Sequence, residues 1–235
     1  RGFYPVEGST VIWRYLDFTK YVHLLNSQHL YFNRLDLFED PLEGTYPVKN
    51  EASIPFFKQL EETRKFSYVN CWHMNDGESA GMWSLYARHA DGVAIQSTFD
   101  RLKTSIEAAP ESILISKVKY HDYAAKSVDE LSDENRWSEN SPGSTVSPQI
   151  FKRKSFEHEK ELRAVYVDLP IEFEPEKIKQ RNLPPGRLVS VNLDALVERI
   201  HVDPKSSGWF YDLVRAVTSR YGLTKDVIKS DLYDR

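Results

Sequence analysis

The segment KRKSFEHEKELRAVYV, residues 152–167, carries a closely spaced set of charged side chains. Four of them occupy every second position: Glu157, Glu159, Glu161 and Arg163. Because side chains alternate across a strand, a strand that began early enough would place all four on one face. Neighbouring carboxylates can differ in pKa, so that one acts as an acid or base, or stabilises developing positive charge. The alternative is a solvated charged rim in which Glu159 and Arg163 form an ion pair.

A second polar cluster lies in NRLDLFEDPLEG, residues 33–44. Its charged and amide side chains are Asn33, Arg34, Asp36, Glu39, Asp40 and Glu43. Several of these oxygens could bind a metal ion, but the spacing does not match a calcium loop, since no glycine falls at the required turn position. Pro41 and Gly44 are typical of a sharp turn, so a capped turn after a strand is the alternative interpretation.

The segment CWHMNDGESAGMWSLYARH, residues 71–89, holds the one cysteine of the chain. Cys71 and His73 point the same way on a strand, which orients them poorly as a nucleophile and its base. The large side chains that follow are more typical of core packing than of a ligand cage: Trp72, Met82, Trp83 and Tyr86. The chain has no phosphate loop, G-x-G-x-x-G, H-E-x-x-H or G-x-S-x-G motif, which argues against most nucleotide hydrolases and α/β-hydrolases.

The composition is that of a folded protein. The 235 residues are 40% hydrophobic and 13% aromatic, enough for a substantial core. The net charge of −4 and the pI of about 6.0 argue against a general nucleic-acid coat protein, although Lys152, Arg153 and Lys154 form a local basic patch. A single cysteine favours the reducing cytoplasm. We expect no membrane association, because no apolar run approaches the roughly 18 residues of a membrane span and no signal peptide is recognisable.

The hydrophobic pattern predicts strands and helices without strict alternation. Strands are expected at 10–17, 29–34, 66–74, 92–98, 112–123, 161–169, 187–192 and 199–204, and as a short final strand near 226–232. Helices are expected at 18–28, 55–65, 78–90, 100–109, 149–156 and 206–222, with a short one near 194–200. This order predicts an α+β fold: one domain over residues 1–235, with a central, twisted mixed sheet flanked by helices. Residues 126–147 lack apolar periodicity and are expected to form an exposed, flexible insertion.

Four motifs occur together in chain order. They are Arg14-Tyr15, Asp40-Pro41-x-Glu43-Gly44, Met82-Trp83-x-x-Tyr86 and Glu159-x-Glu161-x-Arg163. Together they resemble the bacterial domain-of-unknown-function family twenty-nine seventy-one, from about residue 12 to residue 230. The resemblance implies a prokaryotic, cytoplasmic protein and brings no established activity.

The order of the motifs is also similar to that of ADP-ribosyltransferases. In those enzymes a first strand carries an Arg or His that holds NAD, and a late strand carries the catalytic Glu, often as Glu-x-Glu. Arg14 and the pair Glu159 and Glu161 stand in those places. The chain departs from the pattern after the second strand, where YFNRLD replaces a Ser-Thr-Ser triplet. The similarity implies an ADP-ribosyltransferase-like fold with NAD as a small-molecule nucleotide ligand, and it leaves open whether the acceptor is a protein or a nucleic acid.

The leading hypothesis is therefore an NAD-dependent transferase. Cleavage of the bond between nicotinamide and ribose builds positive charge on the ribose, as in glycoside cleavage, and a fixed carboxylate would stabilise it. The catalytic candidates are Glu161 and Glu159. A guanidinium suits a pyrophosphate, and aromatic rings can stack on nicotinamide or adenine. The cofactor-binding candidates are Arg14, Tyr15, Tyr31, Asn33, Trp83 and Tyr86. The supporting candidates are Asp40, Glu43, Arg163 and Arg153.

Two other functions stay open at this point. One is a binding or sensor module without catalysis. The other is a metal-dependent nuclease or phosphoesterase that binds magnesium or manganese through Asp40, Glu43, Glu159 and Glu161. In each case we expect these segments to converge on one cleft with Arg14, because each charged group is costly to desolvate alone. We also expect Glu161 to be more buried than Glu159, and at least one glutamate to have a raised pKa.

Overall fold

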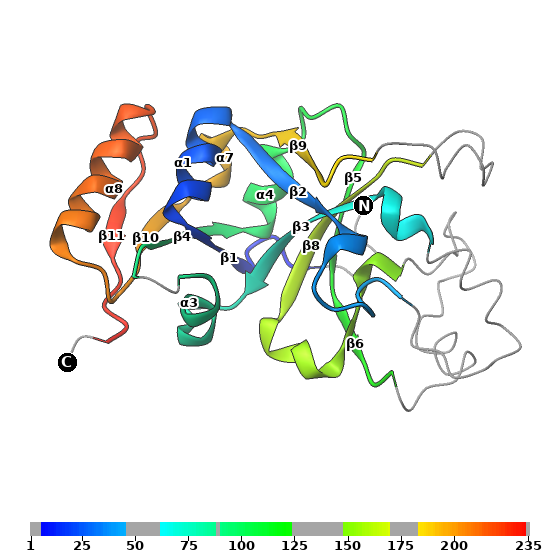
Figure 1. Cartoon of the computed structure of the whole chain (residues 1–235). Helices are drawn as coiled ribbons and strands as arrows, with labels where there is room; N and C mark the ends of the chain where they lie inside the picture. Colours follow the sequence, from blue (N-terminus) through cyan, green and yellow to red (C-terminus); the bar gives the residue numbers. More distant parts are fainter. Residues whose placement is uncertain (1–5, 46–61, 88–89, 124–147, 170–182, 234–235) are drawn as a thin grey trace, which may run out of the picture.

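A nine-stranded mixed sheet lies at the centre of a computed structural model of the chain, which describes residues 6–45, 62–87, 90–123, 148–169 and 183–233 (Figure 1). One path through the sheet runs β11-β10-β4-β1-β3-β2-β9, while β8 pairs with β3 and β5 pairs with β8. The strands are β1 Val11–Asp17, β2 His29–Arg34, β3 Ser67–Met74, β4 Gly92–Thr98, β5 Ile113–Lys117, β8 Glu161–Val167, β9 Gly186–Ser190, β10 Arg199–Val202 and β11 Val227–Lys229. Pairing of β10 with β11 is parallel and the other ladders described in this sheet are antiparallel.

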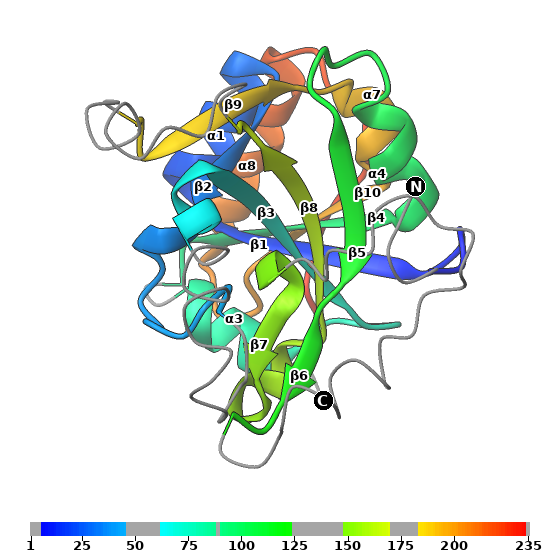
Figure 2. The ribbon, with the colours of Figure 1, turned by 90° about the vertical axis from the view of Figure 1, so that its right-hand side faces the viewer.

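Helices cover both faces of this twisted sheet (Figure 2). One face carries α1 Phe18–Ser27, α4 Phe99–Ser105, α7 Leu193–Leu196 and α8 Gly208–Arg220. The other face carries α3 Ala80–Tyr86 and a small parallel sheet of β6 Lys119–His121 and β7 Phe151–Arg153. The main apolar core lies under the first set of helices and includes Ile12, Leu24, Phe32, Trp72, Ile95 and Val214. The α+β fold with a central mixed sheet, predicted from the sequence, is confirmed.

The local signals place several elements where the sequence predicts them. Asp17 caps α1, because its carboxylate accepts a hydrogen bond from the backbone N–H of Lys20 at 2.8 Å. After α8, Gly222 adopts a left-handed conformation with φ of 78°, which favours glycine and stops the helix. These signals act within a few residues, so they can be read without knowing the fold.

The strand β3 divides the sheet. One of its edges pairs with β8 along Ser67–His73. The other edge is shared: His73 and Met74 pair with β1, whereas Tyr68 and Val69 pair with β2. Between these two ladders, side chains replace a neighbouring strand. Arg14 Nη1 donates to the Cys71 carbonyl at 2.9 Å, and Asn70 Nδ2 donates to the Tyr31 carbonyl at 2.9 Å. The sheet therefore splits between β1 and β2.

Three elements differ from the sequence prediction. The long strand expected at 112–123 is two strands in different sheets, β5 and β6, separated at Val118, whose N–H donates to the Glu161 carbonyl. The helix expected at 149–156 is instead a 3₁₀ turn, the strand β7 and the 3₁₀ helix η5 Lys154–Glu159, because β7 pairs with β6 and tertiary pairing overrides helical preference. The helix expected at 78–90 is shorter in the structure, where α3 spans Ala80–Tyr86; residues 88–89 lie outside the described residues.

Two further expectations concern residues that lie wholly or mostly outside the part of the chain that the structure describes. The insertion expected at 126–147 lies outside the described residues. The helix expected at 55–65 also lies mostly outside them, and its last residues belong to the 3₁₀ helix η3 Glu62–Phe66.

Candidate active site

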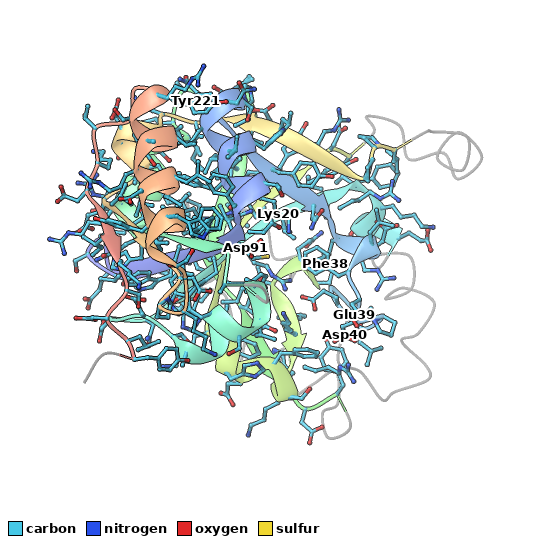
Figure 3. The ribbon with its side chains drawn as sticks, turned by 60° about the vertical axis from the view of Figure 1, so that its left-hand side comes forward. Lys20, Phe38, Glu39, Asp40, Asp91 and Tyr221 are labelled. Atoms are coloured by element: carbon cyan, nitrogen blue, oxygen red, sulfur yellow. The ribbon has the colours of Figure 1, made fainter. Side chains whose placement is uncertain are left out.

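A cavity of about 1000 Å³ lies at the split between β1 and β2. Its walls come from α1, β1, β2, β3, the end of α3, the turn after β2, and the segment from β7 to β8. In Figure 3, Lys20 on α1 and the turn residues Phe38, Glu39 and Asp40 come to the same face of the molecule, and all four line the cavity. Ligand pockets are typically about 300–1000 Å³, so a dinucleotide has room here.

The charged segments named in the sequence meet in this cavity. Arg14, Asp40, Glu43, Glu159 and Glu161 line it. The fully buried Arg163 lies behind them and connects two of the segments. We expected these groups to converge on one cleft, and the structure places them in one.

Arg163 holds the carboxylates of β8 and the turn together. Its Nε donates to Glu161 Oε1 at 2.8 Å and its Nη2 to Glu161 Oε2 at 3.0 Å, which is a bidentate pair. The same Nη2 also donates to Glu43, and Nη1 donates to the Gln149 carbonyl at 2.7 Å. The Arg163 guanidinium therefore connects three segments. It binds β8 through Glu161, the turn after β2 through Glu43, and the 3₁₀ turn before β7 through Gln149.

Lys152 is the second buried cation of the cluster. Its Nζ lies 2.6 Å from Glu159 Oε2, 3.2 Å from Glu161 Oε2 and 3.8 Å from Glu43 Oε2. Sequence reasoning placed Lys152 only in a basic patch, because the expected helix gave no reason to bury it. The strand β7 instead carries it into the cavity wall, where it joins Glu159 to Glu161.

The two buried glutamates respond differently to this arrangement. Burial acts to raise the pKa of Glu161, but Arg163 and Lys152 outweigh burial and lower the pKa to about 2. For Glu43 burial prevails over the same two cations and the pKa is raised. The expected glutamate with a raised pKa is therefore Glu43, while Glu161 stays ionised at neutral pH.

Glu159 and Glu161 do not share a strand face as the spacing suggested. The strand β8 begins at Glu161, whereas Glu157 and Glu159 belong to η5, and Lys160 between them and the strand is left-handed with φ of 41°. The side chain of Glu161 is 5% exposed and that of Glu159 is 16% exposed, so the prediction that Glu161 is the more buried is confirmed. Lys152, and not the strand period, brings the two carboxylates together.

Arg14 is a cation without an acid partner among the described residues. Its guanidinium lies over the Trp72 ring, 5.8 Å from the centroid, and Nη1 donates to the Cys71 carbonyl. Burial is the largest influence on Arg14 and lowers its pKa, and no carboxylate among the described residues lies beside the guanidinium to oppose this effect. An anionic group bound in the cavity would oppose it.

The remaining predicted residues fall into two groups. Tyr15, Tyr31, Asn33 and Tyr86 line the cavity, as does Arg153, whose Nε donates to Asp40 Oδ2 at 2.9 Å. The Tyr86 side chain is partly exposed at the cavity wall, but its hydroxyl is desolvated. This desolvation, followed by the charges of Cys71, Glu159 and Glu161, raises the pKa of Tyr86 to about 12. The prediction that Trp83 stacks on a ligand is wrong. Trp83 is buried in an apolar cluster, and its Nε1 donates to Glu78 at 2.9 Å.

A metal centre is not supported by the carboxylates of the site. Within the described residues, no group of three or more His, Cys, Asp or Glu side chains is arranged to hold a metal ion. The four carboxylates proposed as ligands instead lie against Lys152, Arg163 or Arg153. The described part of the chain also contains no helix that is long and apolar enough to cross a membrane.

Replacing Lys152 by methionine is expected to destabilise the protein by about 3 kcal/mol at pH 7, because the buried carboxylates lose one of their cations. This corresponds to a fall in melting temperature of roughly 6–12 °C for a chain of this size. The deficit should shrink as the pH falls, because protonation of the carboxylates removes their repulsion. Thermal melts between pH 4 and pH 8 measure this. Lys154→Met, at an exposed neighbouring position, is the control, and an equal effect of both variants would contradict the prediction.

Comparisons with known proteins give a limited match. The family model described as a protein of unknown function (DUF2971) matches residues 82–164, which confirms the resemblance over that segment. No curated protein matches the chain.

Three similar solved structures are of DarT from Thermus sp. 2.9. The complex with carba-NAD+ is 10% identical with a TM-score of 0.43, over 96% of this chain and 97% of that chain. The complex with NAD+ is 10% identical with a TM-score of 0.42, over 97% of each chain. The complex with ADP-ribosylated ssDNA is 11% identical with a TM-score of 0.43, over 98% of this chain and 97% of that chain.

Proposed function

We propose that the cavity binds NAD and that the protein transfers ADP-ribose from it. The observation that carries the proposal is Arg14, a cation without an acid partner among the described residues, in a cavity of dinucleotide size whose other wall holds the ionised carboxylate of Glu161. The pyrophosphate of NAD provides the anion that Arg14 lacks, and a guanidinium can bind it through two hydrogen bonds.

The carboxylates then face the nicotinamide ribose. Cleavage of its bond to nicotinamide creates an oxocarbenium-like ribose, which fixed negative charge stabilises. Both oxygens of Glu161 already accept hydrogen bonds from Arg163, and Oε2 also accepts one from Lys152. Glu159 uses only Oε2, toward Lys152, in the contacts described, and it is the more exposed of the two. Glu159 is thus better placed to bond a ribose hydroxyl, while Glu161 contributes fixed charge behind it.

Aromatic side chains complete the binding site. Tyr86 at the end of α3 and Tyr31 on β2 are both exposed and line the cavity from different elements. Stacking on the nicotinamide or adenine ring would bury these faces. Because the two rings line the cavity from different elements, each can stack on a different end of an extended dinucleotide.

NAD is expected to raise the melting temperature of the protein. At a concentration about 100 times its Kd, a ligand that binds only the native state adds about 2.7 kcal/mol, or roughly 5–10 °C here. Differential scanning fluorimetry with NAD, magnesium, manganese and no addition measures this, and chromatography detects released nicotinamide. Stabilisation by manganese without stabilisation by NAD would contradict the proposal and favour a metal-dependent phosphoesterase. Stabilisation by NAD without release of nicotinamide would identify a sensor module.

A further inference from the structure

His73 on β3 lies beside the carboxylates and has one defined tautomer. It lines the cavity and is the cross-strand neighbour of Glu161. Its Nδ1 lies 2.6 Å from the backbone carbonyl oxygen of Glu159. A carbonyl oxygen only accepts hydrogen bonds, so Nδ1 must carry the proton. In the neutral ring, Nε2 therefore keeps a lone pair and can accept a proton.

The surroundings favour this neutral form. Burial is the largest influence on His73 and lowers its pKa, which leaves the ring uncharged at neutral pH. The titratable and charged groups that face it are Glu159, His158 and Lys160 at the end of η5, Glu161 on β8 and Tyr15 on β1. Nε2 has no hydrogen-bond partner among the residues that the structure describes. The ring is thus held by Nδ1 next to Glu159 and has a basic nitrogen available.

We propose that His73 is the general base of the transfer, and that the acceptor presents a group that must lose a proton, such as a hydroxyl, and not a carboxylate. This inference rests on the proposed function of the same cavity. The bond between ribose C1′ and the nicotinamide nitrogen breaks, and its electron pair leaves with neutral nicotinamide. The acceptor oxygen forms the new bond to C1′, and its proton moves to Nε2 of His73. An ionised acceptor carboxylate would need no such base.

The sharpest test compares two small acceptors in one reaction. The wild-type protein is incubated with NAD in the presence of both methanol and sodium azide, and the methyl riboside and the riboside azide of ADP-ribose are quantified. Methanol must lose a proton as it attacks, whereas azide is already an anion. The product ratio is independent of whether nicotinamide release limits the overall rate. His73→Asn keeps a side-chain N–H that can donate to the Glu159 carbonyl but removes the basic nitrogen.

In His73→Asn the ratio of methanol product to azide product is expected to fall on the order of 100-fold, the usual contribution of a general base. NAD affinity and melting temperature should stay near wild type. The control is His158→Asn, which removes an exposed histidine close to the same carboxylates and should leave the ratio unchanged. If His73→Asn does not fold, His73→Gln provides the same comparison. An unchanged product ratio overturns the role of His73 while leaving NAD cleavage intact, whereas a wild-type protein that neither binds nor cleaves NAD overturns the proposed function together with this inference.

Discussion

Replacing Arg14 by methionine is expected to weaken NAD binding by about 10- to 100-fold, because hydrogen bonds to a charged group contribute roughly 1.5–3 kcal/mol. The ligand-free protein should melt at the same temperature or slightly higher. Arg14 has no acid partner among the described residues, so its removal leaves no carboxylate unpaired, and the desolvation cost that it ends offsets the loss of its hydrogen bond to the Cys71 carbonyl. Isothermal titration with NAD and thermal melts of the free protein measure the two effects.

Two further variants separate charge from geometry at this position. Arg14→Lys keeps the charge but loses the planar fork, so it should bind NAD with intermediate affinity. Arg101→Met is the matched control, because Arg101 on α4 also donates to a backbone carbonyl, that of Ala195 at 3.0 Å, and it does not line the cavity. Wild-type affinity in Arg14→Met would remove Arg14 from the pyrophosphate site.

Replacing Glu161 by glutamine is expected to destabilise the protein by about 3–5 kcal/mol at pH 7, since the buried Arg163 loses its bidentate partner. The melting temperature should fall by roughly 10 °C or more. The difference in stability between the wild type and Glu161→Gln depends on pH. The pKa of Glu161 is lowered from 4.5 to about 2 in the folded protein, so its stabilising contribution is complete above the unfolded value and is lost as the pH falls through this window. The melting temperatures of variant and wild type should therefore converge toward pH 2.

Glu159→Gln is the matched variant for catalysis. Glu159 is more exposed and is held by Lys152 alone among the side chains described, so the change should cost little stability. Nicotinamide release from NAD should nevertheless fall by about 100- to 1000-fold, as when one electrostatic stabiliser of a transition state is removed. A stable Glu161→Gln that has lost turnover, beside a fully active Glu159→Gln, would reverse the roles that we assign to the two carboxylates.

The sequence by itself determined the parts of the site that depend on neighbours in the chain. The periods of the apolar residues located β1, β2 and β8, and strand alternation placed Glu161 and Arg163 on one face, where they form an ion pair. Pro41 and Gly44 indicated the turn that carries Asp40 and Glu43. Each of these features arises within a few residues, which is why a pattern in the chain can reveal it.

Only the tertiary structure decided which side chains are buried together. Arg163 meets Glu43 across 120 positions, and Arg14 reaches the carbonyl of Cys71 across 57. Lys152 enters the cavity because β7 pairs with β6, and Glu159 leaves the strand because Lys160 turns the chain. The tertiary structure also decided the surroundings of Trp83 and His73. Trp83 is packed into an apolar cluster, whereas His73 lines the cavity beside Glu159. Pairing between distant strands sets these positions, and a local period carries no information about it.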